Sequence, residues 1–368
     1  MGFFDFLNRK KSPSDPIDRI KQRWSHLSDG LIKDNYSSKI NHYGARFSTN
    51  GFETWFLGLE QRLGQSLGRR LAHAALEHQE FFLKNSGLKI PSSRDPKNWT
   101  ENTLDWQTRG VGVYSKLEDE DEVRLLVESP ASSPICSGLL TSTWEVATTK
   151  RHRFVWSQSS QDGLVVSLNL DHKDLPNPSE IIPLWPNTDS DSVNYELAEE
   201  SWEDLRVEFP GVWSIMNERK IIIHRDLILR FEEFCLPYIS AIESGRQDIE
   251  WPIEDNQRKL WWTAAADSMR EVHFDSGLHI LISKPDDWIG IGRRHLSING
   301  LGAVESAESF NDHGGVKITL KNTFHPAISG GVLLACWERA HGRRGKLKCR
   351  FNSGSMDLFL SSSVDIAD

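Results

Sequence analysis

Cysteine is scarce in this sequence, and its four copies form no closely spaced pair. They stand at positions 136, 235, 336 and 349, too far apart for a C-x-x-C motif. A structural zinc site needs about four ligands, usually with one such pair, and disulfide frameworks are typical of small secreted domains. The spacing therefore predicts reduced thiols, no metal site and a cytoplasmic protein.

Long apolar runs are also missing, because no stretch approaches the ~18 residues that a membrane-spanning helix requires. Residues 1–11, MGFFDFLNRKK, place aromatic side chains before the basic ones, the reverse of a secretory signal. Phe6 stands where N-myristoylation requires Ser or Thr. Two interpretations stay open for this tail: an arm without membrane contact, or a weak contact with a membrane surface.

Basic charge is outweighed by acidic charge, and catalytic motifs are lacking. The chain has 43 Lys and Arg against 52 Asp and Glu, a net charge of −9, which disfavours a nucleic-acid partner. It contains no G-x-S-x-G, H-E-x-x-H or P-loop pattern. We therefore expect no catalytic residues and no cofactor, and favour a non-enzymatic protein.

What the sequence does contain is an internal repeat. Residues 71–90, LAHAALEHQEFFLKNSGLKI, align without gaps to residues 261–280, WWTAAADSMREVHFDSGLHI, with six identical positions. Shorter matches keep the same order along the chain: W-x-x-L at 24–27 and 202–205, P-x-x-W at 96–99 and 285–288, and G-x-G at 110–112 and 300–302. Ordered matches of this kind predict a tandem duplication.

A proline-rich segment separates the two copies. Residues 173–192 contain four prolines and a polar tail, a composition typical of an extended linker. The predicted organisation is a tail at 1–13, a first repeat at 14–172, the linker at 173–192, a second repeat at 193–363 and a tail at 364–368.

Each copy is expected to have the element order α-α-α-β-β-α-β-β. In the first copy, the first helix would include Trp24 and Leu27, helices would follow at 52–66, 68–85 and 134–149, and strands would lie at 104–115, 122–129, 153–158 and 163–170. In the second copy, helices are expected at 195–207, 226–242, 257–275 and 327–341, and strands at 296–305, 315–321, 346–351 and 355–361. Both G-x-G motifs would lie within strands, where they would permit a bulge or close backbone packing.

This order of helices and hairpins predicts an α+β fold with an antiparallel sheet. Two tandem modules of this kind are expected to pack as a pseudo-twofold dimer within one chain.

The segments 123–156 and 316–351 each read as a strand, an apolar helix and a second strand. In this outline each copy resembles a 4-vinyl-reductase-type domain, a fold shared with TRAPP-complex tethering subunits and with ligand-sensing domains of some transcription activators. The resemblance implies ligand sensing or protein scaffolding. Sensory members of the family carry cysteines in the final hairpin, whereas here only Cys349 lies in one, so a zinc role is not implied.

The best-matched polar positions are two glutamates, each directly after a tryptophan: Trp144-Glu145 and Trp337-Glu338. One interpretation is that the four residues line a pocket for a flat apolar ligand. The alternative is that the tryptophans belong to the core and that each glutamate anchors the loop that follows it.

A basic turn follows each of these helices. Its members are Lys150, Arg151 and Arg153 in the first copy and Arg343, Arg344 and Lys346 in the second. Cations after a helix C-terminus complement the helix dipole, which is one reason for their presence. The alternative is a site for an anionic ligand, a phosphate or a lipid headgroup.

These observations predict a non-enzymatic cytosolic small-molecule-binding or scaffold protein built from two sensor-like modules. Its expected partners are a small apolar ligand or another protein. A peripheral-membrane or trafficking-type adaptor and an enzyme with one degenerate copy are the alternatives.

Overall fold

The structure, a computed structural model, describes residues 15–37, 39–117, 122–159, 163–174, 177–187, 192–242, 245–277 and 279–364. Residues 1–11, for which a membrane contact was one interpretation, lie outside these ranges.

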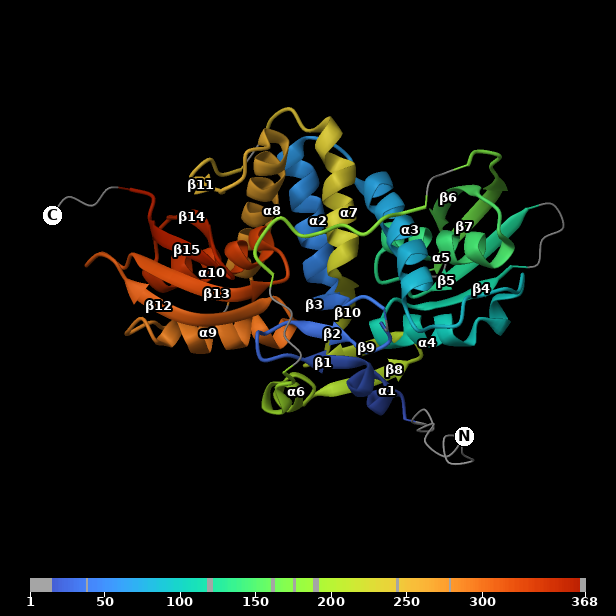
Figure 1. Cartoon of the computed structure of the whole chain (residues 1–368), viewed down its shortest axis with the longest axis horizontal. Coiled ribbons are helices and arrows are strands. Elements are labelled where there is room, and N and C mark those ends of the chain that lie inside the picture. The colour runs from blue at the N-terminus through green and yellow to red at the C-terminus, as the bar shows by residue number, and fades with distance from the viewer. Residues whose placement is uncertain are drawn as a thin grey trace.

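A central antiparallel sheet takes strands from both sides of the linker (Figure 1). Its order is β1-β2-β3-β10-β9-β8, so the two parts of the chain meet where β3 pairs with β10. The strands before the linker are β1 (Trp24–His26), β2 (Ile32–Asp34) and β3 (Tyr43–Ser48), and those after it are β8 (Leu205–Phe209), β9 (Val212–Ile215) and β10 (Glu218–His224).

Two further sheets lie at opposite ends of the molecule (Figure 1). One has the order β4-β5-β7-β6, from β4 (Val113–Lys116), β5 (Val123–Glu128), β6 (His152–Gln158) and β7 (Gly163–Leu170). The other has the order β11-β14-β15-β13-β12, from β11 (Ile249–Glu250), β12 (Gly302–Ser309), β13 (Val316–Thr323), β14 (Gly345–Asn352) and β15 (Ser355–Ser362). Every pair is antiparallel except β11 with β14.

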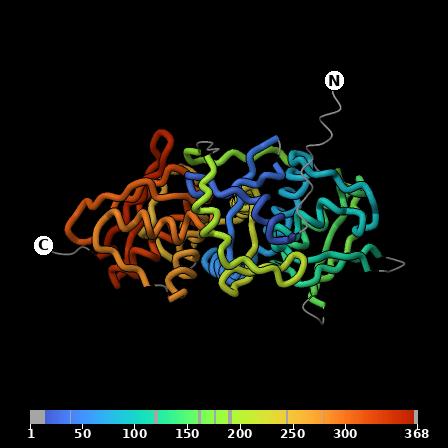
Figure 2. Tube along the Cα trace, turned by 90° about the horizontal axis from the view of Figure 1, so that it is seen from below, coloured from blue at the N-terminus to red at the C-terminus, as the bar shows by residue number. Residues whose placement is uncertain are grey.

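Four long helices stand side by side above the central sheet and fill the middle of the molecule (Figures 1 and 2). They are α2 (Thr49–Leu63), α3 (Gly68–Asn85), α7 (Arg225–Cys235) and α8 (Asn256–Asp275). Helix α2 packs against α8 and helix α7 against α3, while Phe56 and Phe231 join α2 to α7. Each central helix therefore contacts a helix from the other side of the linker.

The outer sheets are attached to this centre through one helix each. Helix α5 (Ser133–Thr148) lies between α3 and strands β6 and β7, and α10 (Pro326–His341) lies between α8 and strands β14 and β15. The remaining helices are α1 (Pro16–Arg23), α4 (Thr100–Arg109), α6 (Tyr195–Ser201) and α9 (Asp287–His295), with 3-10 turns at Pro96–Asn98, Leu236–Tyr238 and Ser297–Asn299.

The predicted α+β class with antiparallel sheets is confirmed, and the strongest helices lie where apolar spacing placed them. Helix α3 covers the predicted range 68–85, and α8 and α10 agree with their predicted ranges within a residue at each end. The start of α2 is fixed by Ser48, whose hydroxyl accepts a hydrogen bond from the Gly51 N–H at 3.0 Å.

The predicted element order was wrong at the start of each predicted copy, where three strands follow the first helix. Helix α1 ends at Arg23, and Trp24, expected inside that helix, begins β1. Likewise α6 ends at Ser201 instead of 207. Helical spacing misled here because Trp24 packs with Ile20 in one apolar cluster, as it would within a helix, although a strand has begun.

The G-x-G motifs were misplaced except for Gly302, which is the first residue of β12. Residues 104–109 belong to α4, not to a strand, and α4 ends at Gly110, which is left-handed with φ +76°. Gly300 has the same φ of +76° and ends a 3-10 turn after α9, a helix that was not predicted. The expected close backbone packing is present, since a Cβ on Gly302 would lie 2.4 Å from the Asn322 carbonyl oxygen.

Candidate functional site

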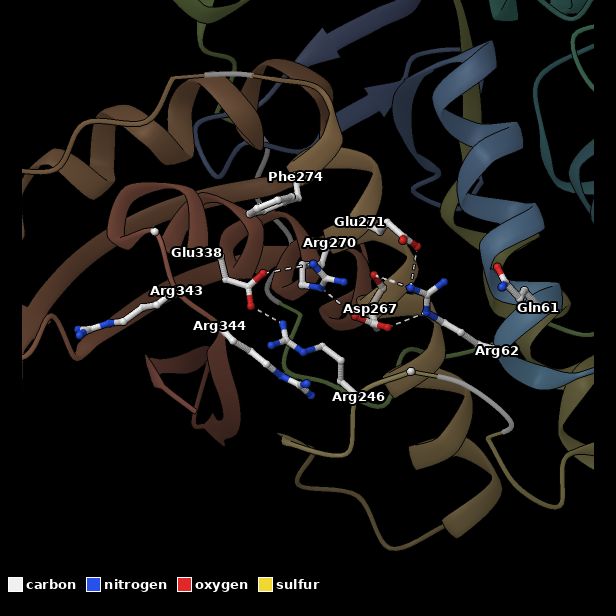
Figure 3. A pocket seen from close by; sticks show the side chains of 12 residues that line it. Gln61, Arg62, Arg246, Asp267, Arg270, Glu271, Phe274, Glu338, Arg343 and Arg344 are labelled. Carbon is white, nitrogen blue, oxygen red and sulfur yellow. Dashed lines mark hydrogen bonds and ion pairs between the residues drawn. The ribbon is translucent and has the colours of Figure 1, made fainter. Parts of the chain in front are cut away.

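An arginine-rich cavity of about 600 Å³ opens between helices of the two parts of the chain (Figure 3). We call it the arginine cavity. Its lining comprises Gln61 and Arg62 from α2, Asp267, Arg270, Glu271 and Phe274 from α8, Glu338 from the end of α10, and Gly245, Arg246, Gly342, Arg343 and Arg344 from loops. A volume of this size lies within the usual range for small-molecule pockets, about 300–1,000 Å³.

Ion pairs of alternating sign run along the wall of the arginine cavity. Arg62 donates to Asp267 at 2.7 Å and to Glu271 at 2.8 Å. Arg270 bridges Asp267 at 2.8 Å and Glu338 at 3.2 Å. Because Arg62 lies before the linker and the others after it, these pairs join the two parts of the chain and fix the guanidinium groups in place.

The chain of pairs continues through a loop residue that the sequence did not single out. Arg246 bonds Glu338, donates to the Gly345 carbonyl at 2.9 Å and lies 3.4 Å from Asp248. Asp248 in turn lies 3.3 Å from Arg344. Burial alone would raise the pKa of Asp267, but Arg270 and Arg62 outweigh it and hold that pKa below its ordinary value.

Both sequence-predicted glutamates anchor the loop that follows their helix, as one interpretation predicted. Glu145 accepts from the His152 N–H at 2.6 Å, and Glu338 accepts from the Gly345 N–H at 2.8 Å. Glu145 also pairs with Arg151 at 2.9 Å, outside the arginine cavity, whereas Glu338 lines that cavity.

The two tryptophans belong to the buried core. Trp144 lies 6.2 Å from Trp99 between ring centroids, and Trp337 donates from Nε1 to the Gly314 carbonyl at 2.8 Å. Neither ring lines the arginine cavity, so a role for these tryptophans in lining a pocket for a flat apolar ligand stays an untested prediction.

The six predicted cations occupy different settings. Arg151 pairs with Glu80 at 2.7 Å, and Arg153 pairs with Asp171 at 3.1 Å near the surface. Lys150 and Lys346 are exposed. Arg343 and Arg344 line the arginine cavity, but the Arg343 guanidinium points away from its centre and lies 5.6 Å from the Trp337 ring (Figure 3).

Sequence reasoning missed Arg62, Arg246, Asp267 and Arg270. They come from three segments, in each of which the charged residues are spaced as on an ordinary exposed surface. They converge only because α2 packs against α8. Glu338 and the basic turn at 343–344 were the local signals for this site.

The cysteines are buried free thiols. Burial raises the pKa of Cys235 and of Cys336 to about 12, which leaves them protonated and unreactive at neutral pH. Across the described ranges, no group of three or more His, Cys, Asp or Glu side chains is arranged to hold a metal ion.

In the part of the chain that the structure describes, every helix is too short or too polar to cross a membrane. Compared with protein-family models, with curated proteins and with solved structures, the chain gives no match. The resemblance to 4-vinyl-reductase-type domains therefore stays a prediction.

Proposed function

We propose that residues 14–172 and 193–363 are two copies of one module, packed about a pseudo-twofold axis. With the 3-10 turns and the two-residue β11 set aside, both segments have the order α-β-β-β-α-α-α-β-β-α-β-β. Ser48 and His224 are the N-caps of α2 and α7 and would be equivalent, an offset of 176 residues (224 − 48). Under this offset Arg46 and Ile222 would occupy the same position in the two copies. They also pair with each other across the β3–β10 junction, as expected for equivalent residues of two strands that meet at a twofold axis.

Exchange of contacts between the copies supports this proposal. Helix α2 packs against α8, and its counterpart α7 packs against α3. The loops follow the same rule: a Cβ on Gly30 would lie 2.5 Å from the Gly302 carbonyl carbon, and one on Gly211 would lie 2.2 Å from the Gly112 carbonyl oxygen. Fused dimers with exchanged elements have this pattern of contacts.

We further propose that this fused pair is a non-enzymatic binding protein whose ligand is a small anionic molecule held in the arginine cavity. The observation that carries the proposal is the wall of fixed arginines. Four carboxylates, those of Asp248, Asp267, Glu271 and Glu338, hold Arg62, Arg246 and Arg270 in place, so their guanidinium groups need little reordering to accept an anion.

The composition of the lining favours binding over catalysis. Its described side chains are arginines, carboxylates, one glutamine and Phe274, without a cysteine, serine or histidine nucleophile among them. Arg344 is the most available cation, since 59% of its side chain is exposed and its contacts with Asp248 are long, at 3.3 and 3.4 Å.

Isothermal titration calorimetry with inorganic phosphate, pyrophosphate and citrate tests the proposal. We expect at least one of these anions to bind, with an affinity that falls as salt is added. Arg344→Gln should weaken that binding about tenfold, as expected for loss of one charge-assisted hydrogen bond worth roughly 1.5 kcal/mol.

Arg153→Gln is the matched control, because Arg153 occupies the corresponding basic turn before the linker and lies outside the arginine cavity. It should leave binding unchanged. Equal loss in both variants, or no binding of any of the three anions, would contradict the proposal. Native mass spectrometry of protein from its source would identify the natural ligand.

A further inference from the structure

Two buried histidines lie in a continuous line of polar contacts between the two parts of the chain. His78 of α3 lies 2.7 Å from Asp226 through Nδ1 and 3.0 Å from His224 Nδ1 through Nε2. The Nε2 atom of His224 lies 2.9 Å from Asp34 Oδ2. Both imidazole side chains have 0% exposure, so no solvent reaches them.

The carboxylates at the two ends of this line are ionised. Asp34 forms a two-point ion pair with Arg23, at 3.0 and 2.6 Å, and Asp226 accepts from Arg230 Nε at 2.8 Å. Burial alone would raise the pKa of both carboxyl groups. Arg23, with His224, holds the pKa of Asp34 below its ordinary value, and His78, with Arg230, does the same for Asp226. An ionised carboxylate can only accept hydrogen bonds.

The number of hydrogens decides the protonation state of the histidines. Three contacts lie in the line, and each needs one hydrogen between its heavy atoms. Two neutral imidazoles supply only two hydrogens, so in the neutral state one contact would set two lone pairs against each other within about 3 Å. We infer that His78 and His224 together bind one additional proton, which forms a buried proton site between the two parts of the chain.

The surrounding charges favour that proton. Three guanidinium groups lie around the pair, from Arg23, Arg109 and Arg230, and four carboxylates, from Asp34, Asp105, Asp226 and Glu77. The sum is one negative charge, which the shared proton neutralises. Tyr36 and His42 also face the cluster, and Glu180 acts on His42 from farther out.

Desolvation acts against this arrangement. It lowers the pKa of His78 considered by itself, to about 4, and it lowers the pKa of His224, with Arg109 adding to the effect. A shared proton is not a property of either ring alone, because coupled groups titrate as a pair. The hydrogen count requires the pair to hold it while both end carboxylates are ionised.

The proton joins segments from both sides of the linker, since Asp34 and His78 precede it and His224 and Asp226 follow it. The folded protein binds the proton, whereas histidines of the unfolded chain, with a pKa near 6.5, release it above that pH. Below about pH 6.5 the unfolded chain binds a proton on each of the two histidines and the folded pair holds only one, so the contribution of this site to stability is greatest near pH 6.5. It falls as pH rises toward the pKa of the pair, with the unfolding constant increasing about tenfold per pH unit until that pKa is reached or other groups titrate.

Nitrogen-15 NMR of the full chain with labelled histidine tests the site directly, without any substitution. At pH 7.5 we expect shifts of protonated nitrogen at His78 Nδ1 and His224 Nε2, and shifts at His78 Nε2 and His224 Nδ1 that reflect one hydrogen shared between these two atoms. Neutral-tautomer shifts for both His78 and His224 at pH 7.5 would overturn the inference.

A stability measurement gives an independent check. His78→Gln removes one of the two rings that share the proton. The decline in stability between pH 7 and pH 9 should therefore be absent in this variant, even if the variant is less stable than the natural sequence. His172→Gln is the matched control, and it should keep the decline of the natural sequence. The same decline in His78→Gln would overturn the inference.

Discussion

At the scale of single residues, the unusual feature of this protein is how many charged side chains it buries. Arg23 is fully buried, with Asp34 at 2.6 Å and Asp105 at 2.7 Å, and it also donates to the Thr108 hydroxyl at 2.8 Å. A side chain at such a site stays charged only while its partners are present, because ion pairing offsets the free-energy cost of desolvation. The cluster is therefore sensitive to the loss of one member.

We predict that Arg23→Met will destabilise the protein by about 3–5 kcal/mol, because it removes the arginine that lies nearest to two buried carboxylates. Chemical denaturation at pH 7 measures this loss. The loss should shrink as pH falls below about 4, the ordinary carboxyl pKa, because Asp34 can then be protonated in the variant at little cost.

Arg293→Met is the matched control for that experiment. Arg293 is paired with Glu196 at 3.1 Å and Glu200 at 2.6 Å, but these carboxylates are largely exposed. Pairs of this kind contribute about 0–1 kcal/mol. A similar loss for Arg23→Met and Arg293→Met would mean that the buried cluster does not need its arginine.

At the scale of elements, two glycines let neighbouring helices approach closely. A Cβ on Gly138 of α5 would lie 2.1 Å from the Ala72 carbonyl oxygen of α3, and one on Gly331 of α10 would lie 2.3 Å from the Ala266 carbonyl oxygen of α8. Both contacts are with backbone, which cannot move aside as a flexible side chain can. These two crossings attach the outer sheets to the central helices.

Gly138→Ala and Gly331→Ala are each predicted to destabilise the protein by at least the ~1–3 kcal/mol typical of overpacking. Thermal or chemical unfolding of the purified variants measures this. Gly290→Ala in α9 is the control, because a Cβ on Gly290 would meet no atom within 4 Å and alanine favours a helix over glycine by roughly 1 kcal/mol. Equal stability of Gly138→Ala and Gly290→Ala would show that the α3–α5 crossing tolerates a wider separation.

The long helices could be predicted from the sequence and the short strands could not. In α3 the apolar positions recur over 18 residues, which is enough for a periodic signal. Strands β1 and β2 have three residues each, and their pairing comes from tertiary contact. The glycine motifs were recognised as sites of close packing. Gly110 and Gly300, however, are left-handed and end a helix and a 3-10 turn, and the G-x-G pattern alone does not distinguish such an end from a glycine within a strand.

The candidate site was predictable only in its local part. The basic turn with Arg343 and Arg344 was identified because it recurs after both W-E pairs. Arg62 and Arg270 became part of the same wall only through the packing of α2 against α8, a contact between residues about two hundred positions apart. Nothing in the alignment of the two predicted copies indicates that α2 packs against α8 and α3 against α7.

At the scale of the whole molecule, the packing of α2 against α8 and of α7 against α3 means that each part of the chain completes the core of the other. Cys235, Trp261 and Phe56 belong to one continuous apolar cluster that extends across both parts of the chain. The linker between them has no helix or strand in its described residues, although Trp185 is buried and donates from Nε1 to the Thr323 carbonyl at 3.2 Å. Cohesion between the copies should therefore depend on the interface and not on the covalent connection.

We predict that cutting the linker will leave the two copies associated. A protease recognition sequence inserted after Ile182, which is 77% exposed, allows the folded protein to be cleaved at one place. The cleaved protein should elute from gel filtration at the volume of the intact chain, also at high salt, because apolar burial supplies most of the cohesion. In urea the two fragments should separate. Two separate peaks in native buffer after cleavage would contradict the exchange of helices, since neither fragment would then need the core of the other.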